Sequence, residues 1–151
     1  MKWYQIKNLT CLKRGKFLNK ARKKYVAAGK QPGRGGDRKS AAYFKERLRF
    51  DVYASSKTEL SDATIRRSIA NYRAIDKKCR KRLIGTWAED NGTALAYIGR
   101  LTPENQRLVV DTIRDNPDMK NILDISTSVC TAFGNELVKC DIVNKDRTKF
   151  I

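Results

Sequence analysis

The sequence predicts an all-α protein, a bundle of six to eight short helices that contains a helix-turn-helix. Apolar residues recur at intervals of three and four along most of the chain, which is the spacing of amphipathic helices. Glycines, prolines and capping residues divide this pattern into short segments. Hydrophobic residues make up 40% of the 151 residues, which is enough for a packed core in one domain or one domain with a tail.

The N-terminal region is expected to hold one basic helix. Residues 2–6 alternate weakly, which suggests a short strand or an extended arm. Gly29 ends the first predicted helix, and the glycine-rich residues 29–37 predict a loop. The helix itself covers residues 16–28, with basic residues on one side and an apolar face made of Phe17, Ala21, Tyr25 and Ala28.

Two helices are predicted next. The first covers residues 40–53, with an inward face made of Ala41, Phe44, Leu48 and Val52. The pattern breaks at residues 58–59 and resumes at Ser61, a good N-cap. Asp62 follows in the first turn, where a carboxylate complements the helix dipole. The second helix covers residues 61–73, with an inward face made of Ile65, Ile69 and Tyr72.

Four further helices are predicted in the rest of the chain, over residues 77–84, 91–100, 103–116 and 119–133. Gly85 ends the first of these, which is short and basic. Thr102 and Pro103 mark a clear restart, because a capping hydroxyl precedes a proline at the first helical position. Residues 135–151 carry no clear pattern, and their end is expected to be loose.

The charge of the chain is high and unevenly distributed. There are 33 lysines and arginines against 16 acids, a net charge of +17. Residues 1–49 hold 16 basic and two acidic residues, residues 50–86 hold nine and four, and residues 87–151 hold eight and ten. Such an excess repels itself in a compact fold unless a polyanion neutralises it. We therefore expect the first part of the chain to bind nucleic acid rather than an anionic membrane.

A helix-turn-helix is predicted in this basic region, with a first helix over residues 49–56, a turn over residues 57–60 and a recognition helix from residue 61. The N-terminal side chains of such a recognition helix reach bases in the major groove, where arginine suits guanine and asparagine suits adenine. The candidates for reading bases are Ser61, Asp62, Thr64, Arg66, Arg67 and Asn71. The candidates for contacting the DNA backbone are Arg22, Lys23, Arg34, Arg38, Lys39, Lys57, Lys77, Lys78 and Arg80.

Two motifs resemble ParB-like plasmid and phage proteins. GRGGDRKS (residues 33–40) and TELSDATIRRSI (residues 58–69) are similar to the helix-turn-helix region of that family, in which a Gly-Gly-Asp-Arg stretch precedes a Thr-Gly-Leu-Ser turn. A short basic helix and the segment LTPENQ (residues 101–106) follow in the same order. The resemblance covers residues 16–115. It implies sequence-specific binding of double-stranded DNA, by a transcriptional regulator or a partition-type factor.

The chain departs from the ParB-like pattern in two places. Glu59 stands where the family turn usually has glycine, and a looser or differently shaped turn is expected because glutamate adopts a positive φ at a higher cost. The arginine-rich box of the family's N-terminal nucleotide-binding domain has no counterpart before residue 33. We therefore expect a DNA-binding portion alone. Its parts are a basic helix and glycine-rich arm (residues 1–36), a helix-turn-helix core (37–116), and a C-terminal helix and tail (117–151).

No enzyme activity, cofactor or metal site is expected. The chain has no histidine, and GKQPGRGG lacks the spacing of a phosphate-binding P-loop. The wide separation of Cys11, Cys79, Cys130 and Cys140 is typical of reduced thiols rather than of a zinc site. Because no segment suits a membrane span or a secretory signal, we expect a cytoplasmic protein. The resemblance to ParB-like proteins implies the bacterial cytoplasm or nucleoid.

Three kinds of partner stay open besides double-stranded DNA. The first is a second copy of the chain, paired through apolar residues that would otherwise close the core of the monomer: Ile122, Leu123, Ile125, Val129, Phe133, Leu137 and Val138. The second is RNA, bound by an antitermination-like regulator with residues 16–28 as its basic element. The third is a host or transcription-machinery protein that a phage or plasmid factor would dock.

Overall fold

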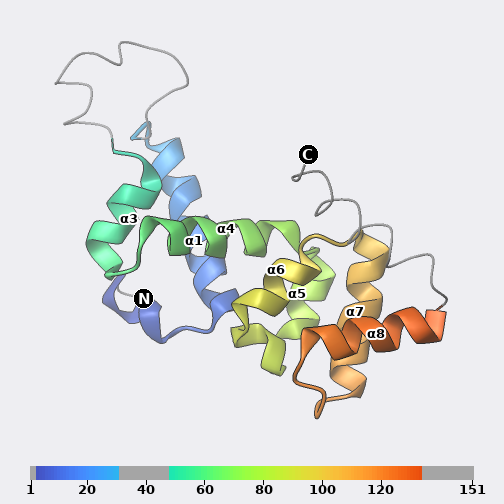
Figure 1. Cartoon of the computed structure of the whole chain (residues 1–151). Coiled ribbons are helices and arrows are strands. Elements are labelled where there is room, and N and C mark those ends of the chain that lie inside the picture. Colours follow the sequence, from blue (N-terminus) through green and yellow to red (C-terminus); the bar gives the residue numbers. More distant parts are fainter. Residues whose placement is uncertain (1–2, 31–47, 134–151) are drawn as a thin grey trace, which may run out of the picture. The chain divides into compact units, whose positions relative to one another are not determined.

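The computed structural model describes residues 3–30 and 48–133 (Figure 1). In these residues the chain is all-α, as predicted, with seven α-helices, two 3₁₀ helices and no strand. The chain divides into two compact units, residues 1–70 and residues 71–151. The division falls within helix α4 (Asp62–Ala74), inside the segment predicted to be the DNA-binding core.

The first unit begins with a 3₁₀ helix, η1 (Trp3–Asn8), and the prediction of a strand or an extended arm was wrong. Tertiary contacts explain the difference. The Trp3 ring lies edge-on to the rings of Phe17 and Tyr53, with centroid distances of 5.5 and 5.9 Å, and Ile6 is fully buried. These contacts fold the segment onto the helices beside it, which a weak local alternation could not indicate.

Helix α1 (Cys11–Ala27) begins earlier than predicted. Thr10 caps it, since its hydroxyl accepts a hydrogen bond from the backbone N–H of Lys13 at 3.5 Å. The extra turn is held by the buried Leu12 and Gly15. Gly29 ends the helix as predicted, with a φ of 66° that suits glycine.

Helix α3 (Phe50–Thr58) and the first part of α4 complete the first unit. The predicted inward positions of Leu48 and Val52 were wrong, because these side chains are 43% and 37% exposed. The helix begins at Phe50, so its core face is shifted, and residues 40–47 lie outside the described residues. The core of the unit consists of Ile6, Leu18, Phe50, Ala54, Ile65 and Ile69. Burying each of the larger side chains stabilises the fold by about 1.5–3 kcal/mol.

The second unit holds the end of α4 and five further elements. They are α5 (Lys77–Leu83), η2 (Trp87–Asp90), α6 (Gly92–Ile98), α7 (Pro103–Asp115) and α8 (Ile122–Phe133). The four α-helices agree with the predicted segments to within a few residues, and η2 was not predicted. The hydroxyl of Thr102 accepts from the backbone N–H of Asn105 at 3.4 Å, and Pro103 opens α7 as predicted.

A buried glutamine connects the start of α5 to α7. The side-chain oxygen of Gln106 accepts from the backbone N–H of Asp76 at 2.8 Å. Its side-chain nitrogen donates to the carbonyls of Ala74 and Leu101 at 3.0 and 3.1 Å. The amide therefore fixes the bend between α4 and α5, where the chain changes direction.

Most of the described apolar residues of α8 lie in the core. Ile122, Ile125 and Val129 are buried, whereas Leu123 is 65% exposed. The side chain of Phe133 and residues 137 and 138 lie outside what the structure describes. Three of the residues predicted to pair two copies therefore close the core of the monomer.

Candidate nucleic-acid interface

A three-residue turn, Glu59 to Ser61, joins α3 to α4. The buried hydroxyl of Thr58 stabilises it by donating to the carbonyl of Ala54 at 2.8 Å and accepting from the backbone N–H of Leu60 at 3.4 Å. Ser61 caps α4 as predicted, because its hydroxyl accepts from the backbone N–H of Thr64 at 3.2 Å. As a result α4 runs across α3 rather than alongside it (Figure 1).

The turn has only three residues between the end of α3 and the start of α4. Glu59 has a φ of 59°, which is the left-handed conformation that glycine would supply more cheaply. Its carboxylate pairs with the ammonium of Lys7 at 3.1 Å. Both side chains are largely exposed, so this ion pair offsets only part of the backbone cost. The packing of Leu60 against the core supplies a further constraint on the turn.

Arg66 and Arg67 are exposed near the start of α4, as predicted. The burial of Ile65 and Ile69 fixes the rotation of the helix and turns the two arginines outward. Within the described residues, Arg67 has no hydrogen-bond or ion-pair partner. Its guanidinium is therefore available for a ligand.

Arg66 is braced by a carboxylate on α3. The distance from Arg66 Nε to Asp51 Oδ2 is 3.5 Å, and Arg49 Nη2 donates to the same oxygen at 2.6 Å. Asp51 is buried, whereas both arginine side chains are 60% exposed. We call these three residues the Asp51 cluster. It holds two cations at the surface in a fixed relation to the turn.

Three of the other candidates for reading bases already make side-chain hydrogen bonds, and the fourth is half-buried. The hydroxyls of Ser61 and Thr64 hydrogen-bond to each other at 2.9 Å, and Asp62 is half-buried in the first turn of α4. Asn71 belongs to the second unit, where its side-chain amide donates to the carbonyl of Gly92 at 3.3 Å. The interactions of Asn71 and of the Ser61–Thr64 pair leave Arg66 and Arg67 as the strongest candidates on α4.

The predicted backbone contacts fall into three groups. Lys57 and Lys23 are exposed in the first unit, and Arg22 is half-buried there. Lys77 and Lys78 are exposed on α5 in the second unit. The third group lies outside the described residues and consists of Arg34, Arg38 and Lys39.

Arg80 differs from its neighbours on α5. Its guanidinium carbon lies 4.2 Å from the centre of the Tyr72 ring, and Nη1 donates to the Tyr72 carbonyl at 2.6 Å. The residue therefore stabilises the end of α4 and has little freedom to contact a phosphate. Asp76 caps α5, where its carboxylate accepts a hydrogen bond from the backbone N–H of Lys78. This hydrogen bond holds the pKa of the Asp76 carboxyl below its ordinary value.

Two members of the Asp51 cluster, Arg49 and Asp51, were not predicted from the sequence. Asp51 was visible only as a lone acid in a basic, helical stretch. Asp51 matters because it contacts Arg66 of α4 across the turn. Helical periodicity relates residues within one helix and does not connect these two. Arg49 was assigned to the helix but precedes it as an extended residue.

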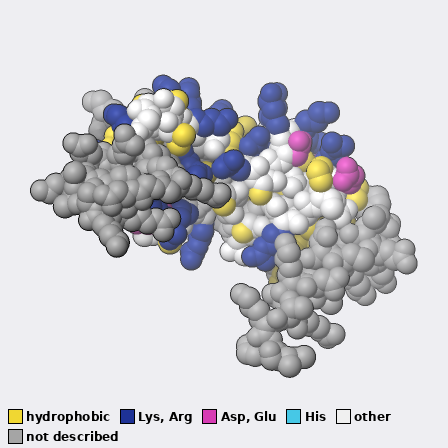
Figure 2. Space-filling model, turned by 90° about the horizontal axis from the view of Figure 1, so that it is seen from above, with side chains coloured by type: hydrophobic (Ala, Val, Ile, Leu, Met, Phe, Trp, Pro, Cys, Tyr) yellow, Lys and Arg dark blue, Asp and Glu magenta, His cyan; other side chains and the backbone are white. Residues whose placement is uncertain are grey.

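The positive charge is concentrated in the first unit. Residues 1–70 hold 19 basic and five acidic residues, a net charge of +14, and residues 71–151 hold 14 and 11, a net charge of +3. Lysine and arginine side chains are frequent on the face drawn in Figure 2, and acidic side chains are few there. A surface of this kind attracts a polyanion and is strongly screened by salt.

Within the described residues there is no cluster of three or more metal-ligating side chains, and no helix is long and apolar enough to cross a membrane. Cys11 and Cys79 are free thiols, and burial raises the pKa of Cys79. Comparison with protein-family models, curated proteins and solved structures found no match to this chain. The resemblance to ParB-like proteins therefore stays a prediction from motifs.

Proposed function

We propose that the chain binds double-stranded DNA through α3, the three-residue turn and α4, used as a helix-turn-helix, and that it acts as a sequence-specific regulator or partition-type factor. The observation that carries this proposal is the pair of exposed arginines one turn into α4. They follow a tight turn in a unit of net charge +14. A recognition helix needs this combination, because its first turns enter the major groove.

The two arginines have different roles in this proposal. Arg67 is unpaired among the described residues and is the first candidate to read a guanine edge with two hydrogen bonds. Arg66 is held through its Nε by Asp51, so its terminal nitrogens reach a base or a phosphate from a fixed position. Arg49 and Lys57 lie at the two ends of α3, where they would contact the DNA backbone and set the orientation of the unit.

Selection of bound duplexes from a random pool tests this function. We expect enrichment of a short common sequence, and affinity for the selected duplex that falls steeply with salt. If five to eight phosphates are neutralised, the slope of log K against log salt is roughly −5 to −7. A flat salt response, or the absence of any enriched sequence, would contradict the proposal. A competing RNA duplex of equal length tests the alternative of an RNA-binding regulator.

The remaining partners stay predictions. A homodimer has less support from α8 than the sequence indicated, since Ile122, Ile125 and Val129 are buried in the monomer. The mass of the protein in solution, free and on its selected DNA, tests pairing. A host protein partner is tested by capture on the intact chain. The location of the protein in the bacterial cytoplasm or nucleoid is part of the same proposal.

A further inference from the structure

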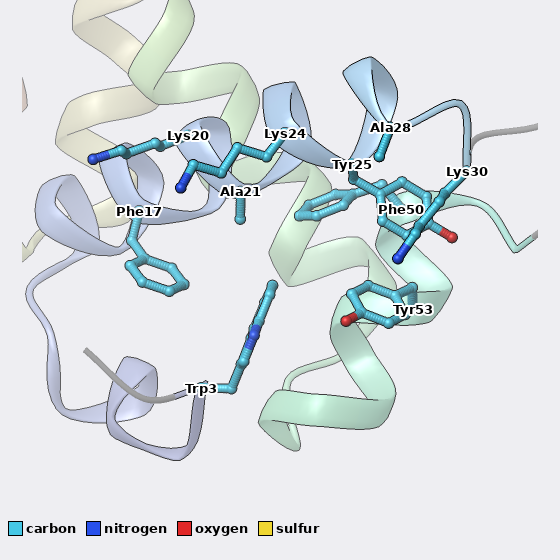
Figure 3. Close-up of a pocket in the computed structure, with 10 residues that line it drawn as sticks. All are labelled: Trp3, Phe17, Lys20, Ala21, Lys24, Tyr25, Ala28, Lys30, Phe50 and Tyr53. Atoms are coloured by element: carbon cyan, nitrogen blue, oxygen red, sulfur yellow. The ribbon is translucent and has the colours of Figure 1, made fainter.

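A cleft of about 590 Å³ opens in the first unit between η1, α1 and α3 (Figure 3). Its lining includes five aromatic side chains: Trp3, Phe17, Tyr25, Phe50 and Tyr53. No residue of α4 lines it. A ligand in the cleft would therefore bind to a different part of the unit from the DNA proposed for α4.

The aromatic walls are held in place by one another. The rings of Tyr25 and Tyr53 are stacked with their centroids 4.9 Å apart, and Tyr25 meets Phe50 edge-on at 5.6 Å. The hydroxyl of Tyr25 donates to the carbonyl of Leu48 at 2.8 Å. Burial, together with the neighbouring Tyr53, raises the pKa of the Tyr25 hydroxyl. The described aromatic residues therefore offer flat apolar faces to a ligand.

Three lysines surround these aromatic faces. Lys20 and Lys24 extend from α1 above Phe17 and Trp3, and Lys30 extends beside Phe50 and Tyr53 (Figure 3). Among the described residues that line the cleft, none is acidic. A ligand that suits this site has a planar ring and a negative charge close to it.

We propose that this cleft binds an unpaired nucleotide of a single-stranded nucleic acid, with its base against the aromatic walls and its phosphates on Lys20 and Lys24. Aromatic faces beside a basic track are the combination that binds single strands without reading their sequence. The volume suits one nucleotide, since pockets for small ligands measure roughly 300–1,000 Å³. A duplex keeps its bases stacked inside and does not offer one to the cleft. Duplex binding by α4 is a separate property, because the two sites share no lining residue.

Trp3 is a built-in reporter for this site, because a base that stacks in the cleft would quench its fluorescence. The only other tryptophan in the sequence is Trp87. Its indole N–H has no partner among the described residues, so Trp87→Phe removes no described hydrogen bond. The full-length Trp87→Phe protein is therefore the background for all measurements, once its thermal unfolding is shown to match the parent.

Four ligands distinguish binding through an unpaired base from binding through phosphate charge alone. The first is an oligothymidylate of about eight nucleotides, a usual site size for single-strand binders. The second is an abasic strand with the same number of phosphates. The third is a hairpin duplex of equal charge, and the fourth is thymidine monophosphate. We expect strong quenching by the oligothymidylate alone.

A matched pair of charge variants tests the role of the lysines. Lys20→Gln with Lys24→Gln removes two charges at the cleft, and Lys13→Gln with Lys16→Gln removes two exposed charges on α1 that do not line it. The first pair is expected to raise the Kd for the oligothymidylate roughly tenfold and the second pair less than about threefold. Phe17→Leu is expected to weaken quenching further, and a melting curve shows whether that variant is folded.

Three results would overturn the proposal. Equal quenching by the abasic strand or the duplex would mean that charge alone attracts the ligand. Thymidine monophosphate binding as tightly as the oligothymidylate would make the cleft a site for free nucleotides. Equal losses in the two lysine pairs would remove the cleft from the binding surface. None of these results bears on α4, whose role is tested by duplex selection.

Discussion

Asp51 on α3 and Arg66 on α4 are joined across the turn between these helices, with 3.5 Å between Asp51 Oδ2 and Arg66 Nε. The same oxygen accepts from Arg49 at 2.6 Å. Because the carboxylate is buried and the two guanidinium groups are exposed, one acid sets the position of two surface cations. Their relation to the turn is therefore part of the fold rather than a property of flexible side chains.

Replacing Asp51 by asparagine is expected to separate two effects on DNA binding: the positioning of Arg66 by Asp51, and the general attraction of DNA by positive charge. The neutral amide no longer pairs with Arg66, so affinity for the selected duplex falls roughly threefold, the size of a mostly exposed ion pair. Affinity for random DNA stays the same or rises, because the variant carries one more positive charge. Fluorescence anisotropy with the two duplexes measures the ratio of the affinity for the selected duplex to the affinity for random DNA.

Glu59→Gln is the matched control for Asp51→Asn. It also removes one carboxylate, but Glu59 pairs with Lys7 and not with an arginine of α4. Its ratio of selected to random affinity is expected to stay unchanged. The positioning role is wrong if both variants change this ratio equally or if neither changes it.

Arg67→Ala is expected to cost about 1–3 kcal/mol on the selected duplex and much less on random DNA, as loss of a guanine contact would. Arg73→Ala is the matched control, since Arg73 is exposed in the last turn of the same helix and only the first turns of a recognition helix reach bases. Titrations at one salt concentration measure both. If Arg67→Ala is silent, α4 does not read DNA in the proposed way.

The conformation of Glu59 predicts an order of stability for substitutions at this position. A φ of 59° is strained for residues with a Cβ, most of all for β-branched ones. We expect Glu59→Gly and Glu59→Asn to stabilise the protein by up to about 1 kcal/mol, and Glu59→Val to destabilise it. Thermal unfolding measures the series. A valine variant as stable as the glycine variant would show that the backbone conformation of the turn costs little.

Gln106→Leu tests the connection between the bend after α4 and α7. The leucine has nearly the same size, but it leaves the N–H of Asp76 and the carbonyls of Ala74 and Leu101 without their partner. Because these groups are partly buried, we expect a loss of about 2–4 kcal/mol in the free energy of unfolding. Denaturant unfolding measures it. A loss below the effect of an ordinary surface substitution would contradict a structural role for this amide.

Local signals in the sequence determined where most helices begin and end. Ser61 caps α4 and Thr102 caps α7 because a side-chain oxygen satisfies an N–H of the first turn, whatever the rest of the chain does. Gly29 and Gly85 follow α1 and α5 with φ values of 66° and 84°, which glycine adopts cheaply. The spacing of Ile65 and Ile69 likewise determined that Arg66 and Arg67 face outward.

Only the tertiary structure decided which residues of distant segments meet. Trp3 and Tyr53 form an edge-on pair, and both line the cleft. Asp51 meets Arg66 across a turn, and Arg80 lies on the Tyr72 ring. A helical period relates residues three or four apart, whereas these contacts depend on how helices pack, and packing is set by the shapes of all the side chains together.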